Sequence, residues 1–364
     1  NSLELVPFKK AIDGGIGSIM IAHIALPQID DEEIKPLKEY RGGDAEAGAE
    51  IVKEKATIPA TLSAKFQTEI LRKEMGFKGL IVSDAMSMSG LTLYFDQEEA
   101  GIRAFLAGTD ILEKPADVDV MLRGLTAAVK SGRIPMERLD DSVRRQIAWK
   151  HELGLFKEKL TPVDKIDTLV SGAESTLLTD EIATKAITLV RNDEGLLPIN
   201  KNARIAVLGL SNGVDGPLTM SSLVNSLRGS GLRFSSAYLQ ENSFADQVAA
   251  ARKAVGEADT VIVGLYGRVR SGAKNSVGIP DNGAAILKEL LASNKKVIGI
   301  SFGNPYVLGG FPEMKTYLVA YGDMPSLQRA SARALLGTQN ITGKLPISLP
   351  GLYPRGTGIQ LAKR

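Results

Sequence analysis

The chain has 364 residues, enough for two domains or one large one, and its 44% hydrophobic and 24% charged residues are typical of a globular protein. A net charge of +2 without a basic block argues against a nucleic-acid partner, and no apolar run is long enough to span a bilayer. The chain lacks cysteine and has only two histidines, which excludes disulfides, thiol nucleophiles and multi-His metal sites. No cofactor is predicted, and the composition leaves export and a cytoplasmic location equally open.

The first part of the chain, residues 1–153, alternates helix and strand patterns. An amphipathic helix is predicted to end at Gly14, and Ser63 is a good N-cap for a later helix. Strands are predicted at 18–24, 79–85 and 109–112, and helices at 64–76, 97–107, 116–131 and 136–153. This alternation indicates parallel α/β units whose apolar strands are covered on both faces. Three strands cannot close a barrel, so the edge of the first should pair with another segment or chain.

The second part repeats the alternation after a polar stretch. We interpret residues 154–180 as a linker and 181–364 as a second domain, which a helix near 180–191 would begin. Strands are predicted at 204–210, 260–267, 296–303 and 316–322, with a weaker one at 234–240, and helices at 217–231, 244–257, 281–294 and 325–337. This order favours an open, doubly wound sheet with helices on both faces.

Asp84 is the most distinctive residue. It follows the apolar run Leu-Ile-Val-Ser at a predicted strand end, and ligands of parallel α/β folds bind at the carboxyl ends of strands. A carboxylate held there can act as nucleophile, general base or metal ligand. The alternative is an Asp that caps the following helix or ties down a loop.

His23 ends another predicted strand in the same way. Its imidazole could bind a substrate hydroxyl or a neighbouring carboxylate, or it could be a buried histidine bonded to backbone. His151 lies on a polar helix end and is expected to be exposed. Met86 and Met88 follow Asp84 and could either supply an adaptable apolar wall to a site or serve packing alone.

The hypothesis that the chain binds a nucleotide can also be tested against the sequence. The segment 204–213 places glycines after a strand, but Gly209 is followed by Leu-Ser-Asn-Gly and does not give the G-x-G-x-x-G fingerprint. A tight strand-to-helix turn explains these glycines better. Phosphate-binding loops that end in G-K-[ST] are absent from the sequence.

The string GFKGLIVSDAMSMSGL resembles the nucleophile signature of glycoside hydrolase family 3. In that family a Gly-Phe-x-Gly strand ends in Ser-Asp, and a methionine follows four residues after the Asp. The segments that agree in order and spacing are LELVPFKKAIDGGIGSIMIAHIALPQID, ATLSAKFQTEILRKEMGF, AGTDIL, GRIPMERLDDSVRRQIAWKHELGLF, ATKAITLVRNDEGLLPI and GKLPISLPG. The Ser-Asp-Ala-Met form is more similar to the β-N-acetylglucosaminidase branch than to the β-glucosidase branch.

The resemblance implies an α/β fold: the C-terminal portion of a (β/α)8 TIM barrel, then an αβα sandwich domain with a mostly parallel sheet. It implies a retaining β-glycoside hydrolase that removes terminal N-acetyl-β-D-glucosamine, with Asp84 as catalytic nucleophile and with His23 and Met88 at the substrate. The chain departs from the family because it begins after the fifth barrel strand and lacks the K-H-F-P-G-H-G motif that precedes the acid/base histidine. An N-terminal fragment or a second copy is expected to complete the barrel.

Two other functions stay open. The chain could be a non-catalytic remnant that binds a carbohydrate or a partner, or a β-glucosidase of the same family. A carbohydrate is the expected ligand in each case, whereas a nucleotide ligand is disfavoured by the missing fingerprint.

Overall fold

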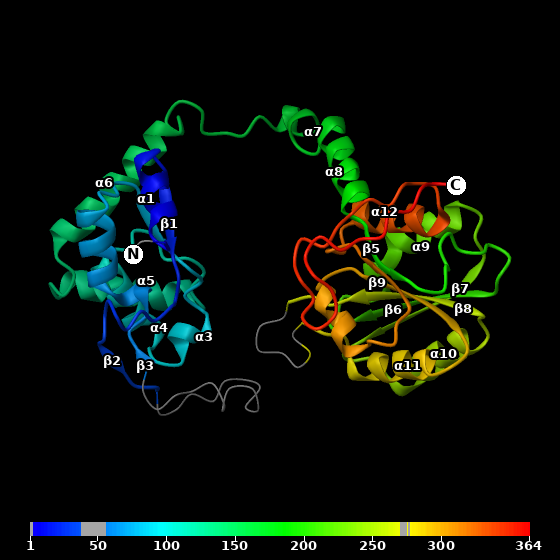
Figure 1. The fold of residues 1–364 in the computed structure, drawn as a ribbon. Coiled ribbons are helices and arrows are strands. Elements are labelled where there is room, and N and C mark those ends of the chain that lie inside the picture. Colours follow the sequence, from blue (N-terminus) through cyan, green and yellow to red (C-terminus); the bar gives the residue numbers. More distant parts are fainter. Residues whose placement is uncertain (1–2, 38–55, 270–274, 276) are drawn as a thin grey trace. The chain divides into compact units, whose positions relative to one another are not determined.

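The computed structural model describes residues 3–37, 56–269, 275 and 277–364 (Figure 1). The chain divides into two compact units, Asn1–Pro162 and Val163–Arg364. Both units combine helices with largely parallel strands, so the predicted α/β class is confirmed.

The N-terminal unit is built on a small parallel sheet. Strand β1 (Ser18–Ile21) pairs in parallel with β4 (Leu80–Ser83), and a parallel bridge from Val82 to Ile111 adds a third strand position. The three strands predicted in this part therefore lie side by side, although the third is reduced to one bridge. Among the residues that the structure describes, no strand pairs with the other edge of β1.

One face of this sheet is covered and the other is open. Ile19, Ile21 and Ile81 are buried together with Leu71 of the π-helical segment η2 (Lys65–Glu74). Met20 points the other way along β1 and is 59% exposed. The expectation that both faces are covered is therefore wrong for β1 within the described residues, because too few strands are present to curl over this face.

The remaining elements of the N-terminal unit surround the sheet. The helices are α1 (Val6–Asp13), η1 (Ala60–Leu62), α3 (Ser89–Thr92), α4 (Gln97–Ala107), α5 (Val118–Lys130) and α6 (Met136–Glu152). A two-residue antiparallel pair, β2 (Glu33–Ile34) with β3 (Ala56–Thr57), lies in a stretch whose polar sequence gave no strand signal. The predicted cap Ser63 accepts a hydrogen bond from Phe66 N at the start of η2 and donates to buried Asp30.

The C-terminal unit contains a six-stranded sheet in the order β5-β10-β9-β8-β6-β7. Its strands are β5 (Thr188–Asn192), β6 (Ile205–Ser211), β7 (Phe234–Gln240), β8 (Thr260–Tyr266), β9 (Lys296–Ser301) and β10 (Thr316–Val319). All neighbours are parallel except β5, which pairs antiparallel with β10. The predicted doubly wound sheet is confirmed, including the weaker strand at its edge.

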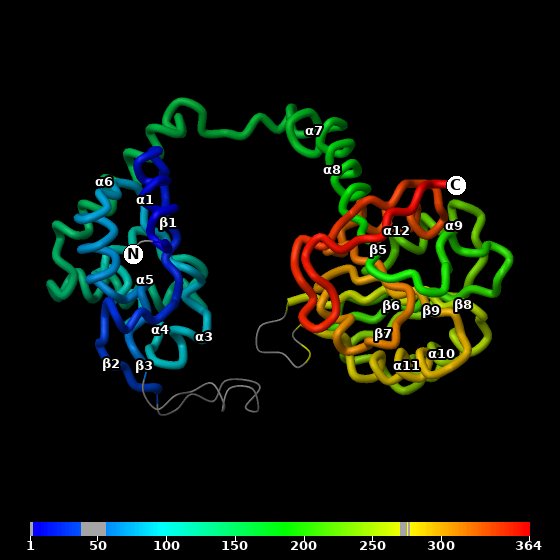
Figure 2. Tube along the Cα trace, in the orientation of Figure 1, coloured from blue at the N-terminus to red at the C-terminus, as the bar shows by residue number. Residues whose placement is uncertain are grey.

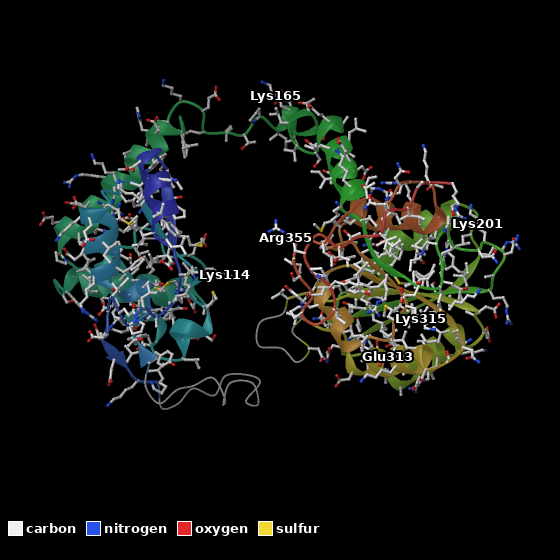
Figure 3. All side chains as sticks on the ribbon, viewed as in Figure 1. Lys114, Lys165, Lys201, Glu313, Lys315 and Arg355 are labelled. Carbon is white, nitrogen blue, oxygen red and sulfur yellow. The ribbon has the colours of Figure 1, made fainter. Side chains whose placement is uncertain are left out.

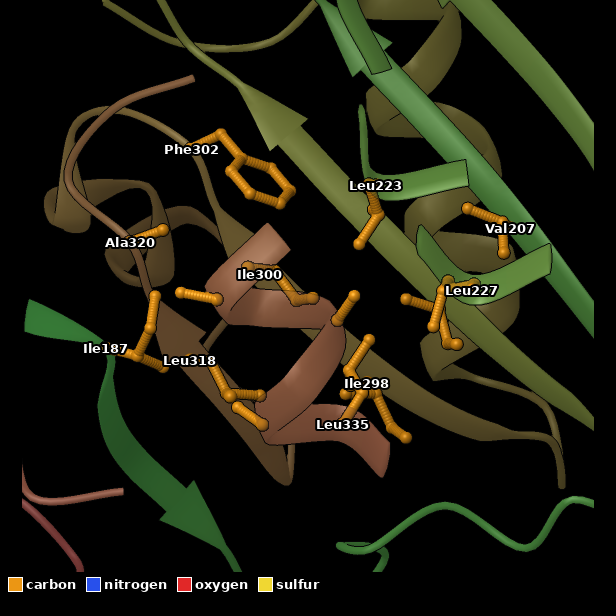
Figure 4. Packing of buried hydrophobic residues seen from close by; sticks show 14 of the residues in the cluster. Ile187, Val207, Leu223, Leu227, Ile298, Ile300, Phe302, Leu318, Ala320 and Leu335 are labelled. Atoms are coloured by element: carbon orange, nitrogen blue, oxygen red, sulfur yellow. The ribbon is translucent and has the colours of Figure 1, made fainter. Parts of the chain in front are cut away.

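Helices cover both faces of this sheet (Figure 2). The helices of this unit are η3 (Val163–Lys165), α7 (Ile166–Leu169), α8 (Ala173–Ala186), η4 (Pro217–Met220), α9 (Ser221–Gly229), α10 (Ala245–Gly256), α11 (Asp281–Leu291), η5 (Pro305–Gly310) and α12 (Pro325–Leu336). Of these, η3 and α7 bury no residue and do not cover the sheet. Figure 4 shows the core on the side of α9 and α12, where Leu223, Leu227 and Leu335 pack on Ile298 and Ile300. A second core lies on the side of α10 and α11.

Two details of the second half differ from the sequence-based expectation. The helix predicted near 180–191 ends at Ala186, and Thr188–Asn192 forms β5, because β-branched and apolar residues there are buried against β10. Gly209 does not form a turn but lies inside β6, where a Cβ atom would come within 2.7 Å of Tyr238 and Met220. This glycine therefore serves close packing over the strand.

Candidate active site

Asp84 follows β4 directly, at the carboxyl end of the middle strand of the small sheet. Its backbone N–H donates to Ile21 O at 2.9 Å, which extends the pairing of β4 with β1 by one residue. The side chain is half-buried, and its Oδ1 accepts a hydrogen bond from Ala85 N at 2.7 Å. From the residues that the structure describes, Oδ2 receives no hydrogen bond, so one carboxylate oxygen is held by the backbone and the other is not.

Backbone hydrogen bonds hold the loop after Asp84 on both sides. Met86 N donates to Glu113 O at 2.8 Å, and Glu113 N donates to Oγ of buried Ser83 at 2.9 Å. Ala85 O accepts from Met88 N at 3.0 Å. The loop is therefore fixed to the neighbouring strand position as well as to itself, which suits a carboxylate that must keep a defined direction.

His23 lies on the other side of the same loop. Its Nε2 is 2.9 Å from Ala85 O, and its Nδ1 is 2.7 Å from Oγ1 of fully buried Thr61. The Thr61 hydroxyl also lies 3.0 Å from Ala22 O and can donate to it. The resemblance assigns His23 to the substrate, but in this structure both ring nitrogens are engaged by groups of the chain itself.

The two methionines of the loop separate into different environments. Met86 is 2% exposed and packs in a core cluster with Leu91, so its role is packing. Met88 is 46% exposed beside the loop that carries Asp84. Of the two, only Met88 is available to a ligand.

The contributions of the third strand position to this loop were not apparent from sequence patterns. Glu113 follows it and bonds the loop of Asp84 from the side, through its backbone alone. Lys114, labelled in Figure 3, has a φ of 42°, which a residue other than glycine rarely adopts. Backbone strain of this kind is frequent near functional sites. A single sequence shows no signal for either feature, because both depend on which strands become neighbours.

A buried ionic cluster supports the opposite end of the same strands. Oδ2 of Asp110 accepts hydrogen bonds from Arg72 at 2.6 Å and from Ile81 N at 3.1 Å, and Oδ1 accepts from Ser142 and Arg145. Burial lowers the pKa of the Arg72 guanidinium, and the negative charge of Asp110 opposes that shift. The amino ends of β4 and of the third strand position are thus tied together, at the end of β4 opposite to Asp84.

Other candidate features do not form a site. Predicted as exposed, His151 is exposed in the last turn of α6. Within the described ranges, no group of three or more His, Cys, Asp or Glu side chains could hold a metal ion. In the same residues, no helix is both long and apolar enough to cross a membrane.

Comparison with known proteins finds similarity along most of the chain. The model of the glycosyl hydrolase family 3 N-terminal domain matches residues 1–148, and that of the family 3 C-terminal domain matches residues 187–354. A beta-N-acetylglucosaminidase/beta-glucosidase of Cellulomonas fimi is 25% identical over 356 residues, which cover 94% of this chain and 59% of that protein. Beta-hexosaminidase A of Pseudoalteromonas piscicida is 29% identical over 218 residues, or 57% of this chain and 33% of that protein.

A solved structure of a family 3 enzyme is also similar to this chain. The glycoside hydrolase family 3 beta-N-acetylglucosaminidase from Paenibacillus sp. str. FPU-7 superposes with a TM-score of 0.75 and 28% sequence identity, over 95% of this chain and 61% of that one. The chain therefore spans less than two thirds of the length of these relatives. With both domain models of one family matched in order, the chain belongs to glycoside hydrolase family 3.

Proposed function

We propose that the chain carries the nucleophile of a retaining β-glycoside hydrolase, that Asp84 is this nucleophile, and that the substrate ends in a β-linked N-acetylglucosamine. The observation that carries the proposal is the half-buried Asp84 carboxylate at the carboxyl end of a central parallel strand, with one oxygen fixed and one free. The activities named for the Cellulomonas and Pseudoalteromonas relatives support the substrate class.

The proposed chemistry is a double displacement. Oδ2 of Asp84 attacks the anomeric carbon, the glycosidic bond breaks, and an acid protonates the departing oxygen. The resulting glycosyl ester on Asp84 is then hydrolysed by a water that the same acid/base group activates. A nucleophile on one face of the sugar and an acid/base group on the other are required. Asp84 supplies one, and we assign the acid/base to a segment outside these 364 residues.

That segment also explains the open strand edge. A parallel strand placed beside β1 would satisfy the backbone groups that β4 does not reach, and further strands that close the barrel would cover Met20, which is 59% exposed. We propose an N-terminal part of the barrel, or a second copy of the chain, as this partner. Met88, 46% exposed beside Asp84, would then form an apolar wall of the sugar site.

Trapping of the glycosyl–enzyme tests the proposal. A preparation that turns over chromogenic β-glycosides, incubated with an activated 2-fluoro glycoside, should gain one sugar mass on the peptide that contains Asp84. The variant Asp84→Ala should lose at least about 1,000-fold in kcat, and azide should restore turnover as the glycosyl azide of inverted configuration. Asp141→Asn, an exposed carboxylate on α6, serves as the matched control and should label normally.

The outcomes separate the alternatives. An unlabelled Asp84 peptide in an active preparation contradicts the nucleophile assignment. Faster turnover of aryl β-glucosides than of aryl N-acetyl-β-glucosaminides would favour the β-glucosidase alternative, which the double name of the Cellulomonas relative keeps open. If no substrate is turned over after the partner segment is supplied, the alternative of a non-catalytic carbohydrate-binding module is favoured.

A further inference from the structure

Two sets of hydrogen bonds, joined through the backbone of Ala85, connect Thr61 with Asp84. Thr61 Oγ1 is 2.7 Å from His23 Nδ1, and His23 Nε2 is 2.9 Å from Ala85 O. Ala85 N in turn donates to Asp84 Oδ1 at 2.7 Å. Ala85 is thus held at its carbonyl by the imidazole while its amide holds the carboxylate, so the direction of the Asp84 side chain is coupled to the His23 ring.

The partners of the ring define which nitrogen carries a proton. A carbonyl oxygen only accepts hydrogen bonds, so Nε2 must be protonated to bond Ala85 O. The Thr61 hydroxyl has one hydrogen and can give it either to Nδ1 or to Ala22 O. If Nδ1 receives it, the ring is neutral. If Ala22 O receives it, Nδ1 must itself be protonated to donate to Thr61. Nε2 is a donor in both cases.

The surroundings leave the ring little freedom to turn away. Thr61 is fully buried and is fixed by its contact with Ala22 O. On the other side, Gly90 approaches so closely that a Cβ atom there would lie 3.1 Å from His23 Cβ. Rotation of the ring would break both hydrogen bonds together and leave the Thr61 hydroxyl with Ala22 O alone.

We propose that His23 is a positioning residue for the nucleophile rather than a substrate ligand. The inference rests on the proposed function of Asp84. In its Nε2–H form the imidazole fixes the carbonyl of Ala85 and thereby the backbone of this residue, and the N–H of Ala85, in the preceding peptide group, then holds Oδ1 of Asp84 so that Oδ2 faces the anomeric carbon. A change at His23 therefore acts on the rate of glycosyl transfer and leaves substrate affinity nearly unchanged.

The first test is spectroscopic and does not depend on activity. Because the chain has only two histidines, His151→Gln leaves His23 as the single source of ring signals in protein labelled with 15N-histidine. The nitrogen–proton correlation spectrum should show a protonated Nε2. An unprotonated Nε2, or signals averaged between tautomers, would overturn the proposal.

The second test is kinetic and uses the active preparation in which Asp84 is assayed. A glutamine side chain places an N–H near the position of Nε2, whereas asparagine reaches only the position of Nδ1. We expect His23→Gln to keep kcat within about threefold of the unchanged protein, and His23→Asn to lose roughly 10- to 100-fold. KM should stay within about twofold in both variants, since the role is in geometry and not in binding.

A conservative change at Thr61 tests the other end of this connection. Thr61→Val keeps the shape of the side chain and removes its hydroxyl, so the ring loses the partner of Nδ1. We expect kcat to fall by roughly 3- to 10-fold at unchanged KM, and the His23 signal to show exchange between tautomers. Retention of the full rate and of a single tautomer in Thr61→Val would contradict a ring held through Thr61.

The remaining outcomes discriminate between the roles of His23. A KM at least about tenfold higher with kcat unchanged in His23→Asn would identify a substrate ligand and overturn the proposal. Equal loss in the Gln and Asn variants would indicate packing alone and would also overturn it. If Asp84→Ala still turns over substrate, the proposed nucleophile fails instead, and the tautomer spectrum still reports on the hydrogen bonds of His23.

Discussion

Arg72 Nη2 donates to Oδ2 of Asp110 at 2.6 Å, and the Asp110 side chain is completely buried. Arg138 and Arg145 also lie within ion-pair distance of the same carboxylate. Removing a buried charge that balances several others is more costly than removing an exposed pair, because the remaining charges stay desolvated. The start of β4, three residues before Asp84, depends on this carboxylate through Ile81 N.

Asp110→Asn should therefore lower the free energy of unfolding of the N-terminal unit by about 3 to 5 kcal/mol. Trp149, the single tryptophan of the chain, lies in this unit and allows urea unfolding to be followed by fluorescence. Asp141→Asn removes an exposed ion pair with Arg144 and should change stability by less than about 0.5 kcal/mol. Equal effects of the two substitutions on the free energy of unfolding would show that the buried cluster stabilises the unit no more than an exposed ion pair does.

Glu99 predicts a measurable dependence of stability on pH. The hydrogen bond from Arg133, with a second from Arg103, lowers the pKa of Glu99 to about 2, although partial burial opposes the shift. A carboxyl group with a depressed pKa stabilises the fold above its unfolded-state value near 4.5, and the effect disappears as pH falls toward 2.

Glu99→Gln should accordingly reduce the free energy of unfolding by about 1 to 3 kcal/mol at pH 7, and the two proteins should converge as pH approaches 2. Trp149 fluorescence again provides the measurement. Glu69→Gln, which removes an exposed pair with Lys73 on η2, is the control and should show little difference at any pH. A constant difference between pH 7 and pH 2 would exclude the ionic explanation.

Gly303 in the C-terminal unit approaches backbone and not a flexible side chain. A Cβ atom there would lie 2.3 Å from Gly267 O, so the ends of β8 and β9 would have to separate. Gly303→Ala should destabilise this unit by about 1 to 3 kcal/mol in calorimetry. Gly309→Ala is the matched control, since a Cβ atom there meets nothing within 4 Å. Unchanged stability of Gly303→Ala would show that the strand ends separate without cost.

Gly90→Ala tests the contact between α3 and His23 in the active preparation. A new methyl group 3.1 Å from His23 Cβ must move the ring by a few tenths of an ångström. We expect kcat to decrease by roughly 3- to 30-fold while KM changes little. The exposed neighbour Ser89, replaced by Ala, should retain the full rate. A loss of the same size at Ser89 would indicate a general disturbance of α3.

Much of the local architecture follows from sequence patterns. Apolar runs predict β4 and β6, and polar caps such as Ser63 predict helix starts, because these features depend on residues that are near in sequence. The end of the helix predicted near 180–191 is instead part of strand β5, because its partner β10 lies more than a hundred residues later in the chain. The pair β2–β3 was likewise missed, because two-residue strands leave no periodicity to detect.

For the candidate site, the sequence by itself determined that Asp84 ends a buried strand and, by resemblance, which family the chain is similar to. Only the tertiary structure decided that Met86 is buried while Met88 is exposed, and that hydrogen bonds joined through the backbone of Ala85 connect Thr61 and His23 with Asp84. The physical reason is the separation in sequence between the residues that interact. A strand end is defined by neighbours along the chain, whereas the contact between His23 and the loop of Asp84 joins residues that only the pairing of β1 with β4 brings together.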